Sequence, residues 1–309
     1  MRLLDAAAVR AATPWTELIA AIAEVLAEEH LTSPERHVHP VGLPDGGEGA
    51  LLLMPAWIDR ELIGVKTVTY FPSNAGTAVP TVNAAYQLLD GRTGQLSAVL
   101  DGDELTDRRT AAISALAADH LARAHAERLL VVGTGRLSPN MARAHAAVRP
   151  LTSIEIWGRR PEAAEAVAEQ LRAEGLPARA TTDLDAGVPS ADIVSCVTGA
   201  TSPLVRGDLL APGSHLDLVG SFQPDMRESD DAAVARASIF VDTVAGALSS
   251  GDLAQPLAGG AIAEASIAAD LRALATGDHP GRTTADEITL FKSAGFAAAD
   301  LAAARLALG

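Results

Sequence analysis

The chain has 309 residues, enough for two domains, and 48% hydrophobic with 20% charged residues is the composition of a globular protein rather than a disordered one. Its 24 Lys and Arg residues stand against 39 Asp and Glu residues, which gives a net charge of −15. So acidic a protein repels nucleic acid and anionic membranes, and we expect neither as a partner.

Cys196 is the single cysteine, so no intrachain disulfide can form. This fits the reducing cytoplasm, which is the expected location. The chain contains no apolar run of the roughly 18 residues that a membrane span needs. Its first residues lack the basic and apolar pattern of a signal peptide. We also expect no metal site.

The first part of the chain combines helices with a β region. Residues 1–30 are predicted to be helical, because the apolar residues after Trp15 recur with helical spacing. No long helix separates the apolar runs that follow, so we expect an antiparallel meander and then an Ala-rich helix from Arg108 to His125. The predicted strands cover 50–57, 62–70, 84–90 and 96–100, and the predicted turns cover 45–47, 74–76 and 90–94.

The second part alternates apolar strands with helices, which predicts a doubly wound parallel sheet of the Rossmann type. Its strands are expected near 129–133, 153–157, 192–197, 215–219 and 238–242. The segment 285–308 is Ala-rich and is predicted to be a helix that returns to the first domain. The expected fold class is therefore α/β: a Rossmann domain over 118–285, and an α+β substrate-binding and dimerisation domain with antiparallel strands over 1–117 and 286–309.

A glycine turn follows the first of the predicted parallel strands. Gly133, Thr134 and Gly135 come directly after an apolar run, and a helix is expected to open at Leu137 and Ser138. A strand that turns through Gly-x-Gly into a helix presents backbone N–H groups to a pyrophosphate. A plain strand–turn–helix connection without a ligand is the alternative.

Two arginines follow the next predicted strand, where an NAD site would place a carboxylate for the ribose hydroxyls. Arg159 and Arg160 instead suit the 2′-phosphate of NADPH. They also fit a solvated entry to the helix that begins at Pro161. Thr198 ends a further strand, where its hydroxyl would lie near the nicotinamide ribose. The alternative is that it belongs to a simple turn without a ligand.

Several stretches, taken in order, resemble the ornithine cyclodeaminase/mu-crystallin family. They cover nearly the whole chain and lie at 64–68, 71–74, 101–117, 132–135, 191–194, 213–220 and 288–295. The resemblance implies a homodimer that processes amino or imino acids with NAD(P). The residues expected to bind the cofactor are Gly133, Thr134, Gly135, Leu137, Ser138, Arg159, Arg160, Thr198, Gly220 and Lys292.

Carried over by position, the resemblance places the ligands of a substrate carboxylate at Arg36, Lys66 and Arg109, with Thr81 lining the same pocket. Lys66 and Arg109 are the expected catalytic residues. A guanidinium binds a carboxylate through two parallel hydrogen bonds, and a lysine in an apolar strand is costly unless it meets an anion. The residues alone also allow Lys66 to point outward and Arg109 to pair with an acid at 101 or 103.

One departure from the family concerns the reaction. Ornithine cyclodeaminases carry an acid two residues after the glycine that here is Gly220, but this chain has Phe222 there. The stretch 220–228 instead resembles the ketimine reductases of the family, and we expect Phe222 to wall the substrate pocket. We do not assign the missing role to Asp225, which lies three residues further on.

The resemblance thus implies an imine reductase, and the two arginines indicate that it uses NADPH, with NADH as a second possibility. Its expected reaction is reduction of Δ1-pyrroline-2-carboxylate and Δ1-piperideine-2-carboxylate to L-proline and L-pipecolate. Three alternatives stay open. They are an ornithine cyclodeaminase or alanine-dehydrogenase-like enzyme, a mu-crystallin-like protein that only binds NADPH and small ligands, and a Rossmann protein of another use.

Overall fold

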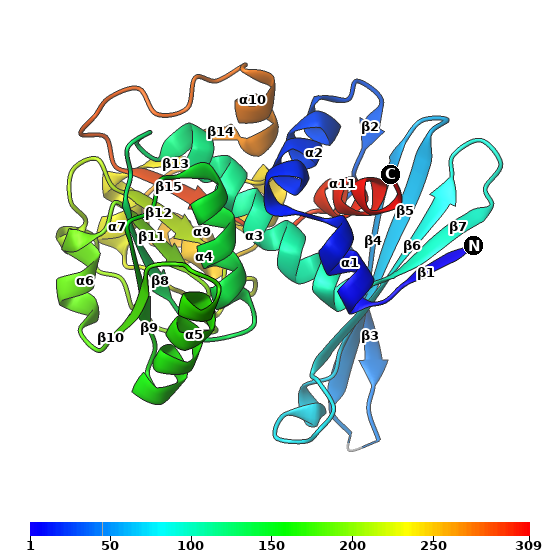
Figure 1. Ribbon diagram of the computed structural model, residues 1–309, viewed down its shortest axis with the longest axis horizontal. Helices are drawn as coiled ribbons and strands as arrows, with labels where there is room; N and C mark the ends of the chain where they lie inside the picture. Colours follow the sequence, from blue (N-terminus) through cyan, green and yellow to red (C-terminus); the bar gives the residue numbers. More distant parts are fainter. Residues whose placement is uncertain (45) are drawn as a thin grey trace. The chain divides into compact units, whose positions relative to one another are not determined.

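The computed structural model describes residues 1–44 and 46–309, and within them the chain forms two compact units (Figure 1). Unit 1 comprises residues 1–110 and 296–309, and unit 2 comprises residues 111–295. The class is α/β, as predicted: one unit holds a mixed sheet and the other a parallel sheet. Because Asp45 lies outside the described residues, so does part of the predicted turn at 45–47.

Unit 1 is built on a sheet with the strand order β1-β7-β6-β5-β4-β2, and β3 also pairs with β4. The four strands from β4 to β7 are antiparallel neighbours, so the predicted meander is confirmed. Its strands are β1 (Arg2–Leu4), β2 (Leu31–Thr32), β3 (His37–Gly42), β4 (Glu48–Ile58), β5 (Leu62–Tyr70), β6 (Val82–Asp90) and β7 (Leu96–Asp101).

A buried helix covers one face of this sheet. The α11 helix (Ala297–Leu308) contacts β4, β5 and β6 on one side and α2 (Trp15–Ala27) on another, and Figure 1 shows it between them. Its residues from Ala297 to Ala304 are all buried, as expected for a helix that is apolar on almost every side. The same unit contains α1 (Ala6–Ala12) and the start of α3 (Gly102–Leu121).

Unit 2 is a parallel sheet with the order β10-β9-β8-β11-β12-β15-β13-β14. Every neighbouring pair is parallel, and the winding direction reverses between β8 and β11. The strands are β8 (Arg128–Val132), β9 (Ser153–Trp157), β10 (Ala178–Thr181), β11 (Ile193–Cys196), β12 (His215–Leu218), β13 (Ser238–Val241), β14 (Ile267–Asp270) and β15 (Thr289–Lys292). In such folds ligands bind at the carboxyl ends of the strands where the order reverses.

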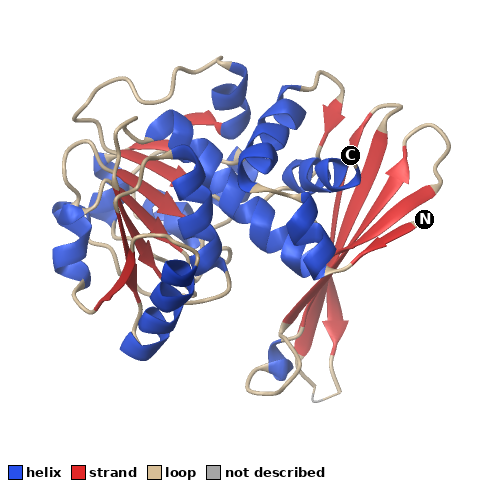
Figure 2. Cartoon of the chain, viewed as in Figure 1, coloured by secondary structure: helices blue, strands red, loops and turns tan. Residues whose placement is uncertain are grey.

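Helices flank this sheet in Figure 2, as the Rossmann prediction requires. Its core is formed by apolar strand residues such as Leu130, Val194, Leu216 and Leu290, all buried. The helices are α4 (Leu137–Val148), α5 (Pro161–Ala173), α6 (Leu184–Ser190), α7 (Asp231–Arg236), α8 (Val244–Leu248), α9 (Gly251–Ala258) and α10 (Leu271–Thr276). None of the helices in the described residues is long and apolar enough to cross a membrane.

The prediction of one helix over 285–308 is wrong. Thr289–Lys292 is the strand β15, paired on both sides near the middle of the parallel sheet, and only 297–308 is helical. The run Ile288-Thr-Leu-Phe291 has a high β propensity, which favours a strand in the first half of the segment. Gly295, at a φ of +78°, separates this strand from the helix. The last helix belongs to unit 1, whereas residues 286–295 before it belong to unit 2.

The prediction that 1–30 is wholly helical also needs correction. Arg2–Leu4 is a short strand parallel to β7, and Pro14, which has no N–H to donate, separates α1 from α2. The helix predicted from Arg108 begins earlier, at Gly102, because the Asp101 carboxylate accepts a hydrogen bond from the Glu104 amide at 2.8 Å and caps the first turn.

Candidate active site

The glycine turn lies at the point where the winding of the parallel sheet reverses. Gly133 follows β8 with a φ of +130°, and a Cβ atom there would lie 2.8 Å from the carbonyl oxygen of Val197, which follows β11. Only glycine permits both the backbone conformation and this close approach. The sequence therefore brings the ends of β8 and β11 together at the expected ligand position.

A cavity of about 450 Å³ opens at these strand ends. It is lined by the glycine turn, by the residues after β9 and by the loop after β11. Thr134, Gly135, Arg159, Arg160 and Thr198 all belong to its lining, so the structure brings these predicted residues together. None of the described residues that line it is acidic.

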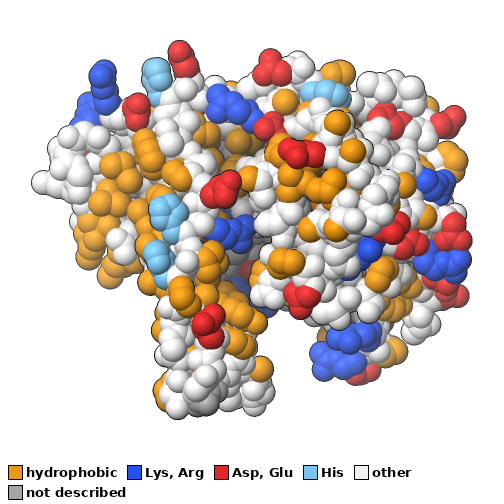
Figure 3. All heavy atoms as spheres, turned by 180° about the vertical axis from the view of Figure 1, so that it is seen from behind, with side chains coloured by type: hydrophobic (Ala, Val, Ile, Leu, Met, Phe, Trp, Pro, Cys, Tyr) orange, Lys and Arg blue, Asp and Glu red, His pale blue; other side chains and the backbone are white. Residues whose placement is uncertain are grey.

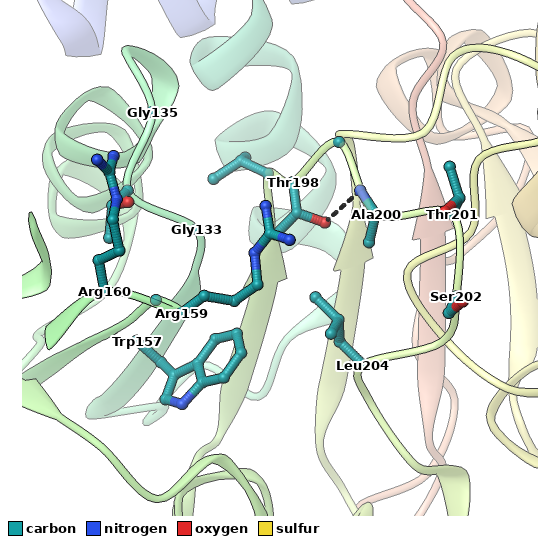
Figure 4. Close-up of a pocket in the computed structure, with 14 residues that line it drawn as sticks. Gly133, Gly135, Trp157, Arg159, Arg160, Thr198, Ala200, Thr201, Ser202 and Leu204 are labelled. Carbon is teal, nitrogen blue, oxygen red and sulfur yellow. Dashed lines mark hydrogen bonds between the residues drawn. The ribbon is translucent and has the colours of Figure 1, made fainter.

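Arg159 and Arg160 supply the positive charge of this cavity. Both are exposed, and in Figure 4 their side chains rise from the strand end beyond Trp157, with Arg159 directed toward Thr198. The carboxylate that precedes them in the chain, Glu155, lies within β9 and pairs with Arg179 instead. The position that would hold a ribose-binding carboxylate thus carries two exposed guanidinium groups.

The cavity fits a dinucleotide. The helix α4 begins directly after the glycine turn, and the amides of a first helical turn attract an anion such as pyrophosphate. Gly158 keeps the turn close, since a Cβ atom there would lie 2.5 Å from Cγ2 of Thr134. A cradle of glycines, a helix start and two arginines together suit a negatively charged nucleotide.

The other predicted cofactor residues lie around the cavity rather than in its lining. Leu137 and Ser138 open α4, and Ser138 is buried. The Gly220 amide donates to the Glu228 carboxylate at 2.7 Å. Lys292, at the end of β15, is fully buried, and its ammonium donates to Asp252 at 2.9 Å and to the carbonyl of Ser221 at 2.6 Å.

Unit 1 contains a second cluster of functional side chains, centred on Asp300 of α11. Its Oδ1 atom accepts hydrogen bonds from Lys66 Nζ at 2.8 Å and from Arg109 Nε at 2.9 Å. The three side chains are almost fully buried. The alternative of an outward-pointing Lys66 is therefore wrong, and the Nε of Arg109 pairs with the acid at 300 rather than with one at 101 or 103.

The register of the sheet explains how Lys66 reaches this position. Lys66 pairs with Met54 on β4 and with Tyr86 on β6, and all three are buried on the face that α11 covers. A Cβ atom on Gly64 would lie 1.8 Å from the Tyr86 hydroxyl, so this glycine makes room for the tyrosine. Sequence alternation thus directs one lysine into an otherwise apolar layer.

Two cations share one anion in this cluster, which leaves a formal charge of +1 in a buried place. Burial, reinforced by the nearby charge of Arg109 and opposed by Asp300, lowers the pKa of Lys66 to about 8. The charge of Arg36 contributes to the same shift, which places this half-buried arginine near the lysine. In the described residues, Arg109 Nη1 and Nη2 have no hydrogen-bond partner. The arrangement is therefore suited to a carboxylate.

The two other residues predicted for the substrate pocket, Thr81 and Phe222, belong to different units. Thr81 directly precedes β6 and lies five residues before Tyr86, the partner of Lys66, which is about 16 Å at the usual rise per residue. Phe222 lies in the loop after β12 and is 46% exposed. Asp225 in the same loop is exposed as well.

Two acidic residues in these clusters were missed in the sequence. Asp300 is the only charged residue in the apolar stretch from Phe296 to Ala304, which was the signal that could have identified it. Glu228 ends the motif that begins at Gly220, and its carboxylate bonds the ends of two strands. A group of three His, Cys, Asp or Glu side chains able to hold a metal ion is not found in the described residues.

Comparison with known proteins agrees with the resemblance seen in the sequence. The model of the ornithine cyclodeaminase/mu-crystallin family matches residues 2–308. A Δ1-pyrroline-2-carboxylate reductase from Paracoccus denitrificans is 40% identical over 280 residues, which cover 90% of this chain and 88% of the relative.

Solved structures show the same fold over the full length. The Thermococcus litoralis Δ1-pyrroline-2-carboxylate reductase, solved with NADH and L-proline, superposes with a TM-score of 0.92 at 30% identity, covering 99% of this chain and 96% of the other. An archaeal alanine dehydrogenase dimer with bound NAD superposes with a TM-score of 0.91 at 25% identity, covering 99% and 94%.

Proposed function

The chain belongs to the ornithine cyclodeaminase/mu-crystallin family, and on this basis we propose that it is an NADPH-dependent reductase of cyclic ketimines that carry a carboxylate. The proposed substrates are Δ1-pyrroline-2-carboxylate and Δ1-piperideine-2-carboxylate, with L-proline and L-pipecolate as products. The observation that carries the proposal is the buried, positively charged cluster of Lys66, Arg109 and Asp300.

The cluster matches the substrate in charge and in hydrogen-bonding capacity. Asp300 uses the Nε of Arg109, so the two terminal nitrogens remain for the two oxygens of a substrate carboxylate. A bound carboxylate would bring the formal charge of the cluster from +1 to zero, which removes the cost of burying an unbalanced cation. Arg36, which lies near Lys66, would be a further ligand.

The reaction adds a hydride to the imine carbon and a proton to its nitrogen. A nicotinamide cofactor bound in the unit 2 cavity would supply the hydride. The chain's own residues orient the substrate through Arg109 and keep a proton on Lys66 Nζ. Because the pKa of Lys66 is about 8, this group is largely protonated at neutral pH and yet releases its proton readily. The lysine thus suits the role of acid toward the imine nitrogen.

The preference for NADPH rests on Arg159 and Arg160. Each guanidinium is exposed at the cavity and no acidic residue lines the described part of it, so a 2′-phosphate would be attracted there. The Thermococcus litoralis relative was solved with NADH. Cofactor selectivity is therefore the part of the proposal that needs its own measurement.

We also propose a homodimer that uses the uncovered face of the unit 1 sheet. Strand alternation directs Leu53, Trp57, Ile63, Val65 and Leu89 away from the Lys66 face, and each is only half buried in one copy of the chain. Figure 3 shows hydrophobic side chains gathered on this unit, at the left of the view. Apolar surface of this kind is usually covered by a partner, and the archaeal alanine dehydrogenase is a dimer. Light scattering would give the mass.

Activity assays distinguish the proposal from its alternatives. Purified protein should oxidise NADPH when a cyclic ketimine is added and should release no ammonia from ornithine. Release of ammonia without net cofactor turnover would indicate a cyclodeaminase, and NAD reduction with alanine would indicate an alanine dehydrogenase. Cofactor binding with no turnover of any of these compounds would indicate a protein that only binds the cofactor.

A further inference from the structure

Near the carboxyl ends of the strands of unit 2, three fully buried charged side chains are connected by hydrogen bonds. They are Glu228 in the loop after β12, Asp252 in α9 and Lys292 at the end of β15. Asp252 connects the other two: one of its oxygens accepts from the Glu228 amide at 2.7 Å, and the other accepts from Lys292 at 2.9 Å.

The Glu228 carboxylate joins the ends of two neighbouring strands. Its Oε1 accepts from the Thr198 amide at 2.6 Å and from the Thr198 hydroxyl at 2.9 Å, directly after β11. Its Oε2 accepts from the Gly220 amide at 2.7 Å, directly after β12. One side chain thereby satisfies three part-buried donors and fixes the distance between two loops.

The backbone carbonyl of Glu228 provides a second connection between the same two loops. Its carbonyl accepts from the amides of Leu204 and Val205 at 2.9 and 3.0 Å, at the far end of the loop that begins at Thr198. Thr198 and Leu204 both line the dinucleotide cavity. The conformation of this cavity wall therefore depends on residue 228, although Glu228 itself is not part of the lining.

The loop that carries Phe222 is fixed at both of its ends. Near its start, the Ser221 carbonyl accepts from Lys292 at 2.6 Å. Near its end, Glu228 is bonded to Thr198, Gly220 and Asp252. This loop replaces the one in which ornithine cyclodeaminases carry their acid, so the same contacts position the cavity wall and the segment that distinguishes the reaction.

We propose that Glu228 is a positioning residue that couples the cofactor-lining loop 197–205 to the Phe222 loop 220–229 through one shared carboxylate. The proposal rests on the proposed function only in taking the ligand of the cavity to be a dinucleotide. All three donors to the carboxylate are satisfied only when both of its oxygens accept. A protonated Glu228 would turn one oxygen toward an N–H or O–H group as a donor, and the coupling would weaken.

The surroundings of Glu228 make this protonation accessible near neutral pH. Burial and the charge of Asp252 raise the pKa of Glu228 to about 7, against the opposing effect of Lys292. The buried thiol of Cys196 in β11 is a further titratable group that interacts with Glu228. Cofactor affinity should therefore be highest above pH 7 and should fall as the pH is lowered through 7.

The test compares Glu228→Gln with the natural protein in two measurements. Fluorescence titration with NADPH and with NADH, without imine, should show about 10- to 100-fold weaker binding in the variant, because a glutamine cannot accept from both Thr198 and Gly220. The affinity of the natural protein should fall between pH 8 and pH 6, and this dependence should be absent in the variant. Unchanged affinity and an unchanged pH dependence in the variant would overturn the proposal.

Hydrogen–deuterium exchange without cofactor tests the coupling itself. Peptides covering 197–205 and 220–229 should both exchange faster in Glu228→Gln, and equal protection in the two proteins would overturn the coupling. Asp192→Asn is the matched control, since Asp192 also accepts from backbone amides, those of Glu127 and Arg128, but before β11 rather than after it. It should leave both loops protected.

Two further outcomes keep the proposal separate from the proposed function. If Glu228→Gln does not fold, the pH dependence of NADPH binding by the natural protein becomes the test of the coupling. A constant affinity from pH 6 to pH 8 would then overturn it. If the natural protein binds neither NADPH nor NADH, the dinucleotide site is wrong. Hydrogen–deuterium exchange in the two loops would then still support or overturn the positioning role of Glu228.

Discussion

The Lys66 ammonium lies 2.8 Å from Oδ1 of Asp300, a carboxylate 234 positions later in the chain. The same oxygen accepts from Arg109, whereas Oδ2 is buried and has no hydrogen-bond partner among the described residues. One acid from the last helix thus sets the charge of the lysine and the orientation of the arginine. The charge and geometry of the substrate site depend on this contact.

Asp300→Asn should shift the pH dependence of imine reduction. The pKa of Lys66 is lowered to about 8 by burial, and Asp300 is a group that raises it. Removing that charge lowers the pKa further, so kcat/KM should begin to fall at a pH below 8 instead of near 8. The measurement is a pH profile of kcat/KM for the cyclic imine.

Two reference variants make this profile decisive. The pH profile of Lys66→Met should lack the decline near pH 8. Its kcat should fall about 100-fold or more, which is the usual contribution of a positioned acid to the rate. Asp90→Asn removes an exposed carboxylate from a turn of the same unit and should keep the natural profile. If the decline stays near pH 8 in Asp300→Asn, the acid does not control Lys66.

Arg109→Met should raise KM for the imine about 10- to 100-fold, with a smaller change in kcat, because hydrogen bonds to a charged group are worth about 1.5–3 kcal/mol. Arg108→Met is the control. The neighbouring arginine donates to the hydroxyl of Thr13 at 2.7 Å and lies over the ring of Trp15. Its loss should lower the free energy of unfolding and leave KM unchanged. Equal KM values in the Arg109 variant and the natural protein would remove Arg109 from the site.

Gly64→Ala should destabilise unit 1 by about 1–3 kcal/mol or more, the usual cost of overpacking a core. The new Cβ atom would lie 1.8 Å from the hydroxyl and 2.7 Å from Cζ of Tyr86. Tyr86→Phe removes the closer of these two atoms. The double variant should therefore recover part of the lost stability in urea unfolding, and strictly additive effects would contradict the contact.

Replacing Arg159 and Arg160 by alanine should reduce selectivity for NADPH. Loss of the two guanidinium groups should weaken NADPH binding about 10- to 100-fold and change NADH binding little, since only NADPH carries the 2′-phosphate. The readout is the ratio of dissociation constants from fluorescence titration. Arg172→Ala, an exposed arginine of α5 that pairs with Glu165, should keep the natural ratio. A natural ratio that already favours NADH would contradict the assignment.

The sequence predicted well those parts of the fold that depend on local pattern. The strands from β4 to β7 alternate in burial, and turns such as Asp90–Gly94 separate them. The prediction failed for β15, because a short strand beside an Ala-rich helix has a helical composition over any long window. Its place between β12 and β13 is set by pairing with residues far away in the chain.

In the candidate sites, too, residues within a local pattern were predicted and residues brought together only by folding were not. The glycine turn and the two arginines were found because each follows a recognisable strand, and Lys66 and Arg109 were found through the family resemblance. Asp300 and Glu228 were missed, since each acts by accepting hydrogen bonds from residues brought close only by folding. A single acid within an apolar helix was the available signal for Asp300.

The central claim is tested most directly by following NADPH oxidation with Δ1-pyrroline-2-carboxylate and Δ1-piperideine-2-carboxylate, for the natural protein and for Lys66→Met. We predict saturable turnover of at least one of these imines, formation of L-proline or L-pipecolate in equal amount to the NADPH consumed, and a loss of about 100-fold or more in the variant. No NADPH oxidation with either imine, together with ammonia release from ornithine, would contradict the account.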